Sequence, residues 1–406
     1  MKKIIFIAAV LLAVACASAQ EKDFSFKFYG KIRAELFYNS RANEELVDGL
    51  FYLYPKNHDY DSDGGDLNAA PQGSFYSIFS RVGVDIGGPL IGKAKSSAKV
   101  ELDFRGSGST FSIARLREAY VNLDWGHTDL LIGQTWHPLF GEVAPSVLNL
   151  STGAPFQPFN RSPLIRWRYK IPAGLRFTAS AIWQSQYASA GPEGKSHNYI
   201  KNGMIPEIFI GVDYLRDGLT AGIGGELLSL QPRRKSEIDG AVYKVKERVT
   251  SLSAEAHVKY RAPMWTASAK TLFANNLTQT CMLGGFGVTD TDPRTGQREY
   301  TPFRHSATWF NFVYGQKWQP GIFLGYMKNL GTGKPVTGET YGVGLDIDQL
   351  FASYWQISYN VKAWKVGVEF STATAYYGKM DNADGRIRDA HSVTNYRLLG
   401  VVVFSF

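Results

Sequence analysis

Long segments of strict alternation between apolar and polar residues limit most strongly what this chain can fold into. In residues 24–38, FSFKFYGKIRAELFY, one phase is almost wholly apolar and the other carries Lys, Arg and Glu. The same pattern recurs in residues 75–87 and 96–106. A period of two residues indicates a β-strand, and soluble strands are usually about 5–6 residues long. Segments of roughly 9–15 residues therefore favour strands that cross a membrane in a barrel.

Short turns and long polar connections alternate between these segments. The short turns are rich in Gly, Pro, Asp and Asn, as turn geometry requires, and they fall at 87–93, 124–129, 170–174, 215–218, 261–264, 317–321 and 360–364. Counting the segments between connections predicts an all-β fold, a transmembrane antiparallel β-barrel of about 16 strands with both ends on the periplasmic side. Because hydrocarbon offers no hydrogen-bond partners, the sheet must close on itself. A barrel of this width leaves room for a channel.

The first twenty residues, MKKIIFIAAVLLAVACASAQ, have a basic start, an apolar run and a small-residue exit. They predict a signal peptide over 1–19, cleaved before Gln20, and a mature barrel over 20–406. Lipoprotein processing at Cys16 is the alternative. No later stretch is apolar over the 18 or more residues that a transmembrane helix needs. These features together predict the outer membrane of a Gram-negative bacterium.

The charge and cysteine content exclude two further classes. Loss of Lys2 and Lys3 with the signal lowers the formal net charge from +8 to +6, and the remaining basic residues form no long run. Nucleic acid is therefore not an expected partner. The mature chain retains a single cysteine, Cys281, which excludes an intramolecular disulfide. Aromatic residues beside the short turns, such as Trp125 and Trp364, are typical of the lower girdle of a barrel.

The connection after the fifth predicted strand differs from the other upper loops. Residues 136–161, WHPLFGEVAPSVLNLSTGAPFQPFNR, are rich in Pro and apolar groups. An apolar loop at the top of a barrel must bury itself, and the lumen is the available place. Packing against a neighbouring subunit is the alternative. The sequence thus predicts a constriction-type loop over 137–161, with candidate residues His137, Phe140, Glu142, Phe156, Phe159 and Arg161.

Three short motifs carry a family resemblance. LLIGQTWHPLF (130–140), SPLIRWRYK (162–170) and NLGTG (329–333) resemble the trimeric porins of the Gram-negative outer membrane, most closely the DcaP-like branch. The resemblance implies a homotrimer of sixteen-stranded barrels, each with its own pore and an inward-folded third upper loop. General porins place acidic groups on that loop, opposite a basic ladder. This chain departs from that pattern, because residues 137–161 contain one acid, Glu142, and one base, Arg161.

Charged residues on the inward phases are the candidate pore lining. They are Arg33, Arg81, Lys99, Glu101, Arg105, Glu118, Tyr120, Arg166 and Arg168. The bases would attract anionic solutes by electrostatic focusing, but the acids on the same wall leave mutual neutralisation as an equal alternative. Arg115 and Arg117 count onto the outward phase, where charge at mid-membrane would cost about 2–4 kcal/mol. They would lie above the hydrocarbon, face a subunit contact, or turn inward through a bulge.

One motif suggests a metal. DYDSDG places Asp59, Asp61 and Asp63 as in the opening of a calcium loop. The expected closing acid is absent, because Ala70 occupies that position, although Asp66 could substitute. Calcium in this outer loop and a solvated acidic loop are the two alternatives, and no other cofactor is expected.

The function predicted from these features is that of a porin, which allows passive diffusion of small hydrophilic solutes, with anionic solutes as one alternative. The chain is not expected to be an enzyme, since it contains no G-x-S-x-G, Walker A or H-E-x-x-H motif. The rival functions are an outer-membrane barrel enzyme of lipase type and a plugged structural or adhesive barrel. Expected partners are membrane lipid, lipopolysaccharide, further copies of the chain and the barrel-assembly machinery.

The last segment, NYRLLGVVVFSF (395–406), alternates to its final residue. It is expected to pair with residues 24–38 and so close the barrel. Phe404 and Phe406 lie on its outward phase, and a terminal aromatic residue resembles the assembly signal of outer-membrane barrels.

Overall fold

The computed structural model describes residues 24–46, 51–106 and 113–406. It is a closed antiparallel β-barrel of 16 strands, which confirms the predicted fold class. The predicted signal peptide, 1–19, lies outside the described residues. Among the described residues no helix has both the length and the apolar character needed to cross a membrane.

The wall strands follow one another around the barrel in chain order, and β4 and β5 together form a single wall strand beside β1. The wall consists of β1 (Ser25–Asn39), β4 (Gln72–Tyr76) with β5 (Arg81–Ile91), β6 (Ala94–Gly106), β7 (Ile113–Asp124), β8 (Thr128–Trp136), β9 (Arg161–Lys170), β10 (Leu175–Ile182), β13 (Glu207–Arg216), β14 (Leu219–Leu230), β17 (Val249–Arg261), β18 (Trp265–Asn275), β20 (Arg298–Tyr314), β21 (Trp318–Gly331), β23 (Ile347–Val361), β24 (Trp364–Asp381) and β25 (Arg386–Ser405).

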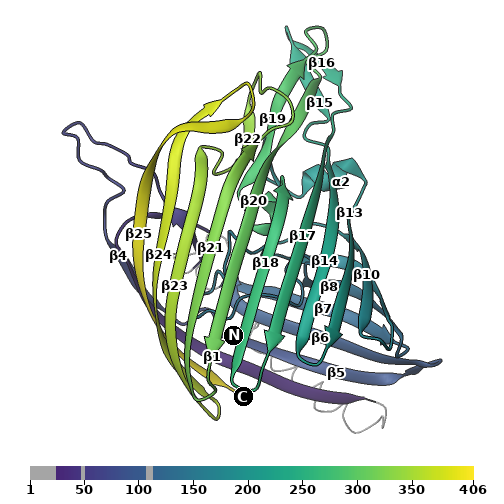
Figure 1. Cartoon of the computed structure of the whole chain (residues 1–406). Coiled ribbons are helices and arrows are strands. Elements are labelled where there is room, and N and C mark those ends of the chain that lie inside the picture. The colour runs from purple at the N-terminus through teal and green to yellow at the C-terminus, as the bar shows by residue number, and fades with distance from the viewer. Residues whose placement is uncertain (1–23, 47–50, 107–112) are drawn as a thin grey trace, which may run out of the picture.

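Shorter elements belong to the long connections. They are β2 (Asn43–Glu45), β3 (Tyr52–Pro55), β11 (Ala190–Gly191), β12 (Gly194–Lys195), α2 (Asn198–Gly203), β15 (Lys235–Ile238), β16 (Ala241–Lys244), the 3-10 helix η1 (Thr278–Thr280), β19 (Gly284–Thr291) and β22 (Thr340–Val343). In Figure 1 α2, β15, β16, β19 and β22 lie toward one end of the barrel, and the C terminus lies at the other, beside the short turns.

The barrel closes where the last strand pairs with the first. β25 pairs with β1 from Lys31 opposite Ser405 to Asn39 opposite Arg397. Gly30 N donates a hydrogen bond to Phe406 O at 2.9 Å, and Phe406 N donates to Gly30 O at 3.0 Å. A Cβ atom on Gly30 would lie 2.6 Å from the Phe406 ring. Glycine is therefore what allows the terminal aromatic ring to lie over the first strand.

Alternation gives the wall two chemically different faces. On β25 Tyr396 and Leu398 are exposed on the outer face, as is Phe406 directly after the strand, whereas Arg397 and Leu399 are buried on the inner side. Phe404 packs beside Trp364 on the same outer face, with ring centroids 4.8 Å apart. This arrangement follows from the two-residue period of a strand, and it places large aromatic residues around the end of the barrel that carries the short turns.

A β-bulge shifts the phase of β7. The β6–β7 pairing passes from Glu101 opposite Glu118 to Leu102 opposite Leu116, which leaves Arg117 as an extra residue. Beyond the bulge Leu116 faces outward and Arg115 faces the lumen. The outward placement of Arg115 and Arg117 that strict alternation predicted is therefore wrong, because one extra residue reverses the phase. The bulge that the sequence left open as an alternative is what the structure contains.

Candidate functional site

The third upper connection, between β8 and β9, folds into the lumen as predicted. It comprises residues 137–160, here called the constriction loop, and Arg161 is the first residue of β9. On one wall Lys270 Nζ of β18 donates hydrogen bonds to Leu139 O at 2.6 Å and Phe140 O at 3.2 Å. On another, Glu369 of β24 accepts a hydrogen bond from Leu148 N at 2.9 Å. A loop that reaches both strands must cross the lumen.

The second half of the constriction loop packs on the wall between these two anchors. Phe156 is fully buried against Phe323, and a Cβ atom on Gly325 would lie 2.7 Å from the Phe156 ring. Trp309 Nε1 donates a hydrogen bond to Gln157 Oε1 at 2.9 Å. The loop therefore rests on β21 through an aromatic contact and on β20 through this hydrogen bond and that from Ser146 N to Asn311 Oδ1, at 2.8 Å.

The end of the constriction loop joins an aromatic cluster. Phe159 packs edge-on against Trp136 and Phe51, with ring centroids 5.1 and 4.8 Å apart. The Arg161 guanidinium lies over the Trp136 ring, 4.6 Å from its centroid, and Phe140 stacks on the same ring. These predicted loop residues thus fix the loop rather than face open water.

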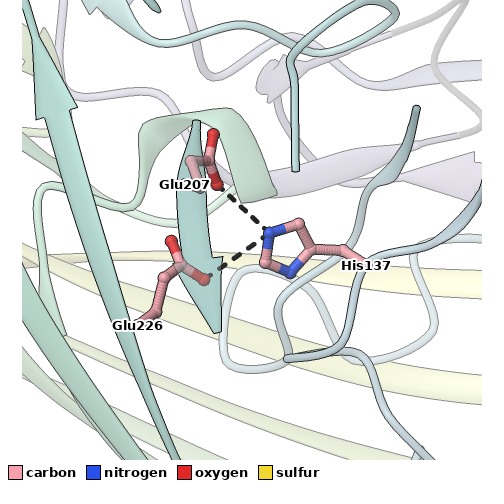
Figure 2. Close-up of side chains that lie close together, drawn as sticks. All are labelled: His137, Glu207 and Glu226. Atoms are coloured by element: carbon pink, nitrogen blue, oxygen red, sulfur yellow. Dashed lines mark hydrogen bonds and ion pairs between the residues drawn. The ribbon is translucent and has the colours of Figure 1, made fainter. Parts of the chain in front are cut away.

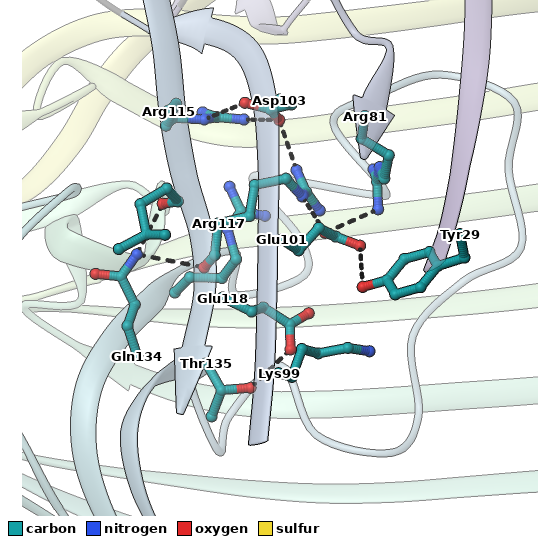
Figure 3. A network of polar contacts seen from close by, with 12 residues as sticks. Tyr29, Arg81, Lys99, Glu101, Asp103, Arg115, Arg117, Glu118, Gln134 and Thr135 are labelled. Atoms are coloured by element: carbon teal, nitrogen blue, oxygen red, sulfur yellow. Dashed lines mark hydrogen bonds and ion pairs between the residues drawn. The ribbon is translucent and has the colours of Figure 1, made fainter. Parts of the chain in front are cut away.

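One bank of charged groups lies on β5, β6 and β7 (Figure 3). Arg117 Nε lies 2.5 Å from Glu101 Oε1, and its Nη1 lies 2.9 Å from Asp103 Oδ2. Arg115 Nη2 approaches Asp103 at 2.6 Å, and Arg81 Nη1 approaches Glu101 at 3.3 Å. Three guanidinium groups therefore share two carboxylates, and Lys99, Asp85 and Glu118 on the same strands bring the bank to four basic and four acidic groups.

The remaining predicted wall residues are mostly paired. Arg33 forms an ion pair with Glu35 and donates a hydrogen bond to Leu148 O of the constriction loop. Lys99 lies 3.2 Å from Asp85. Glu118 accepts a hydrogen bond from Thr135, and Tyr120 lies opposite Lys99 in the strand register. The side chain of Arg105 lies outside the described residues.

A second bank of charged groups, on β9 and β10, faces the constriction loop across a cavity of about 220 Å³. The residues that line this cavity include Glu142, Arg166, Arg168 and Arg176. Arg168 and Arg176 lie 3.1 and 3.2 Å from Glu142. Within the described part of the chain Arg166 makes no hydrogen bond or ion pair, and its Nε is buried. The cavity lining also contains Asp213 and Glu255, which pair with Arg176 and Lys270. Arg166 is therefore the guanidinium of this lining that has no acidic partner among the described residues.

Glu142 gives this site a dependence on pH. Burial acts to raise the pKa of its carboxyl, but the charges of Arg176 and Arg168 outweigh burial and hold that pKa below its usual value. Because the folded-state pKa is depressed, the ion pairs contribute fully at neutral pH and are lost as pH falls through the depressed value. We expect this loss to change the wild-type conductance below about pH 4.

The variant Glu142→Gln is expected to lack this acid-dependent step, because it cannot ionise. Bilayer conductance measured between pH 7 and pH 3 checks this expectation. Glu299→Gln, which removes an exposed glutamate that pairs with Lys334 in an upper loop, is the matched control. An acid-dependent step of wild-type size in Glu142→Gln would contradict the role of Glu142.

The carboxylates of the acidic outer loop accept hydrogen bonds from groups of the protein. Asp61 accepts hydrogen bonds from the main-chain N–H groups of Asp63 at 2.9 Å and Gly65 at 2.8 Å. Asp66 accepts from Arg41 at 3.1 Å and lies 2.8 Å from His58 Nδ1. These contacts hold the turn in place. A calcium site formed by Asp59, Asp61 and Asp63 stays a prediction.

Several residues of the site were not identified from the sequence. They are Arg176, Lys259, Lys270 and Glu369. For Lys270 a signal existed, since it is the single charge on the inward phase of β18. A charge in that position faces either water or a loop that fills the lumen.

A closed barrel whose third upper loop crosses the lumen between two banks of charged side chains is the fold of the outer-membrane porins. Among solved structures the chain is similar to the outer membrane channel DcaP of Acinetobacter baumannii, with 16% identity, a TM-score of 0.66, and coverage of 95% of this chain and 99% of DcaP. No protein-family model and no curated protein matches the chain.

Two further solved structures share the fold. The trimer form of OmpT, an outer membrane protein of Vibrio cholerae, matches with 13% identity, a TM-score of 0.56, and coverage of 95% of this chain and 100% of that one. The anion-selective porin from Comamonas acidovorans matches with 10% identity, a TM-score of 0.54, and the same coverage. At these identities the likeness concerns the fold.

Proposed function

We propose that this chain is an outer-membrane porin that allows passive diffusion of small hydrophilic solutes, with a preference for anions. The observation that carries the proposal is the constriction loop crossing a lumen whose wall is charged. An interior that holds ionised groups of both signs requires water, and a loop that narrows it limits the size of the solute. No chemical step is part of this proposal.

Unequal pairing of charges supports the anion preference. Most wall acids are matched by a base, as in Lys99 with Asp85 and Arg168 with Glu142. Arg166, by contrast, has no ion-pair partner among the described residues, and its Nε is buried. Uncompensated positive charge in a narrow lumen raises the local concentration of anions. The similarity in fold to an anion-selective porin is consistent with this proposal.

The proposal includes the setting of the protein. The exposed outer face, with residues such as Leu36 and Ile210, is suited to lipid. A homotrimer in the outer membrane is proposed because OmpT, which shares the fold, has a trimer form. Export by a cleaved signal peptide, contact with lipopolysaccharide and insertion by the barrel-assembly machinery complete the proposal.

Conductance across a planar bilayer under a salt gradient tests the function. We expect stepwise currents and a reversal potential that indicates anion preference. Folded protein that gives no current would contradict a porin and favour a plugged barrel. Hydrolysis of labelled phospholipid that a single serine substitution abolishes would favour a barrel enzyme.

The variant Arg166→Gln tests the origin of the preference. A unit charge at about 4–8 Å in water is worth roughly 0.5–1 kcal/mol. It acts with opposite sign on anions and cations, so we expect the ratio of anion to cation permeability to fall about five- to thirty-fold. The matched control is Arg216→Gln, which removes the same charge from an exposed position at a short turn. An unchanged reversal potential in Arg166→Gln would refute the role of this arginine.

A further inference from the structure

A buried cluster holds the beginning of the constriction loop (Figure 2). His137 is the first residue of the loop, Glu207 is the first residue of β13, and Glu226 lies in β14. Each residue is at most 1% exposed. His137 Nε2 lies 3.2 Å from Glu207 Oε2 and 3.5 Å from Glu226 Oε2. Three potential metal ligands therefore converge on one point from three segments of the chain.

The cluster has more negative charge than its neighbours compensate. Within the described residues no lysine or arginine pairs with Glu207 or Glu226; the ion pairs of both acids are to His137. Gln184 Nε2 donates a hydrogen bond to Glu207 at 2.6 Å, which supplies a dipole but no charge. Two buried carboxylates that lack a full positive counter-charge are costly. The site thus requires a positive charge at its centre.

Two buried oxygen atoms at the cluster also indicate a missing positive charge. Glu226 Oε2 and Gln279 Oε1 have no hydrogen-bond partner among the described residues. Gln279 Nε2 lies between the two acids, 3.2 Å from Glu207 Oε2 and 3.3 Å from Glu226 Oε1. A half-turn of the Gln279 amide would bring its oxygen to the same point, because amide oxygen and nitrogen have nearly the same shape.

We propose that His137, Glu207 and Glu226 bind a divalent transition-metal cation of the zinc type. Zinc ligands lie about 2.0–2.2 Å from the metal at tetrahedral angles, so that neighbouring ligand atoms are roughly 3.3–3.5 Å apart. The distances of 3.2 and 3.5 Å from His137 Nε2 fit this spacing. A dication with two carboxylates and a neutral imidazole also gives a site of zero net charge.

Binding of a cation would change which ring nitrogen of His137 carries the proton. Leu139 N donates a hydrogen bond to His137 Nδ1 at 3.2 Å, so Nε2 carries the ring proton when no cation is bound. A cation on Nε2 moves that proton to Nδ1, and the contact with Leu139 N lengthens. A proton shared by Glu207 and Glu226 is the competing way to relieve their repulsion.

A bound cation would join the constriction loop to the wall. His137 belongs to the loop, whereas Glu207 and Glu226 belong to neighbouring wall strands. The cation would therefore hold the beginning of the loop as Glu369 holds its middle. This inference concerns the structure of the loop and goes beyond the proposed conduction of solutes.

Zinc titration of the folded, full-length protein tests the inference. After removal of metals with a chelator, we expect wild type to bind about one zinc ion per chain and to unfold at a higher temperature with zinc. Glu226→Gln keeps the side-chain shape but removes the charged ligand. We expect it to weaken zinc binding more than about 100-fold, beyond the effect typical of losing a group outside the ligand set. Glu207→Gln is a second variant with the same expected result.

Glu369→Gln is the matched control, because it also removes a fully buried glutamate that holds the constriction loop. We expect this variant to keep wild-type zinc affinity. Wild type that binds no zinc, or Glu226→Gln that binds it equally well, would overturn the inference. If wild type binds none and Glu226→Gln is more heat-stable in metal-free buffer, the acids share a proton instead.

Discussion

Deletion of Phe406 is expected to lower the yield of folded barrel about ten-fold. The deletion removes the two main-chain hydrogen bonds between Phe406 and Gly30, at 2.9 and 3.0 Å. Each is worth roughly 0.5–1.5 kcal/mol, and about 1.4 kcal/mol corresponds to a factor of ten. The deletion also takes away the ring that lies over Gly30 at the closing seam. The folded fraction is measured by gel electrophoresis of membrane samples, as the share of the chain whose mobility changes on heating.

Phe406→Ala separates the two contributions, because it keeps the main chain and loses the ring. We expect an intermediate yield from this variant. Pore conductance of the molecules that do fold should match wild type, since Phe406 faces outward. Wild-type yield after the deletion would refute the role assigned to Phe406 in assembly.

Gly325→Ala is expected to displace the constriction loop and to destabilise the barrel by about 1–3 kcal/mol, the usual cost of overpacking a buried site. The new Cβ atom would lie 2.7 Å from the fully buried Phe156 ring. The ring can retreat from β21 only toward the lumen, so the single-channel conductance should fall. Thermal unfolding and bilayer recording measure the two effects.

Gly225→Ala is the matched control, because its Cβ atom would meet no atom closer than 3.7 Å, the main-chain oxygen of Ser253. Both variants add the same methyl group to a strand glycine, and Gly225 lies in β14. Equal conductance and stability in the two variants would show that Phe156 does not fix the loop.

The fold could be predicted from the sequence because the evidence for it is local. A period of two residues shows which side of a strand faces lipid, as for Tyr396 and Leu398, and requires no knowledge of the partner strand. The apolar character of residues 137–161 likewise sufficed to place that loop inside the barrel. Short turns and long loops then fixed which ends of the strands lie together.

The ion pairs of the site depend on how neighbouring strands align. The two-residue period within one strand does not predict that alignment. Arg81 lies directly opposite Asp103 across β5 and β6, yet it pairs with Glu101, while Arg115 and Arg117 contact Asp103. Two arginines on the outward phase made a bulge one of three alternatives, but the alternation could not place it at Arg117, where the register shifts. The cluster of His137 with Glu207 and Glu226 joins residues far apart in the chain, which no spacing rule connects.

The attachment of one loop to several parts of the wall has a mechanical consequence. Lys270 of β18, Trp309 of β20 and Glu369 of β24 each hold a different point of residues 137–160, and Arg33 of β1 holds Leu148. A thin-walled tube flattens easily under uneven sideways load, whereas an internal tie between distant wall points resists ovalisation. Lateral pressure from the bilayer is thus borne partly by the loop, and any distortion of the tube's cross-section is transmitted directly to its narrowest point.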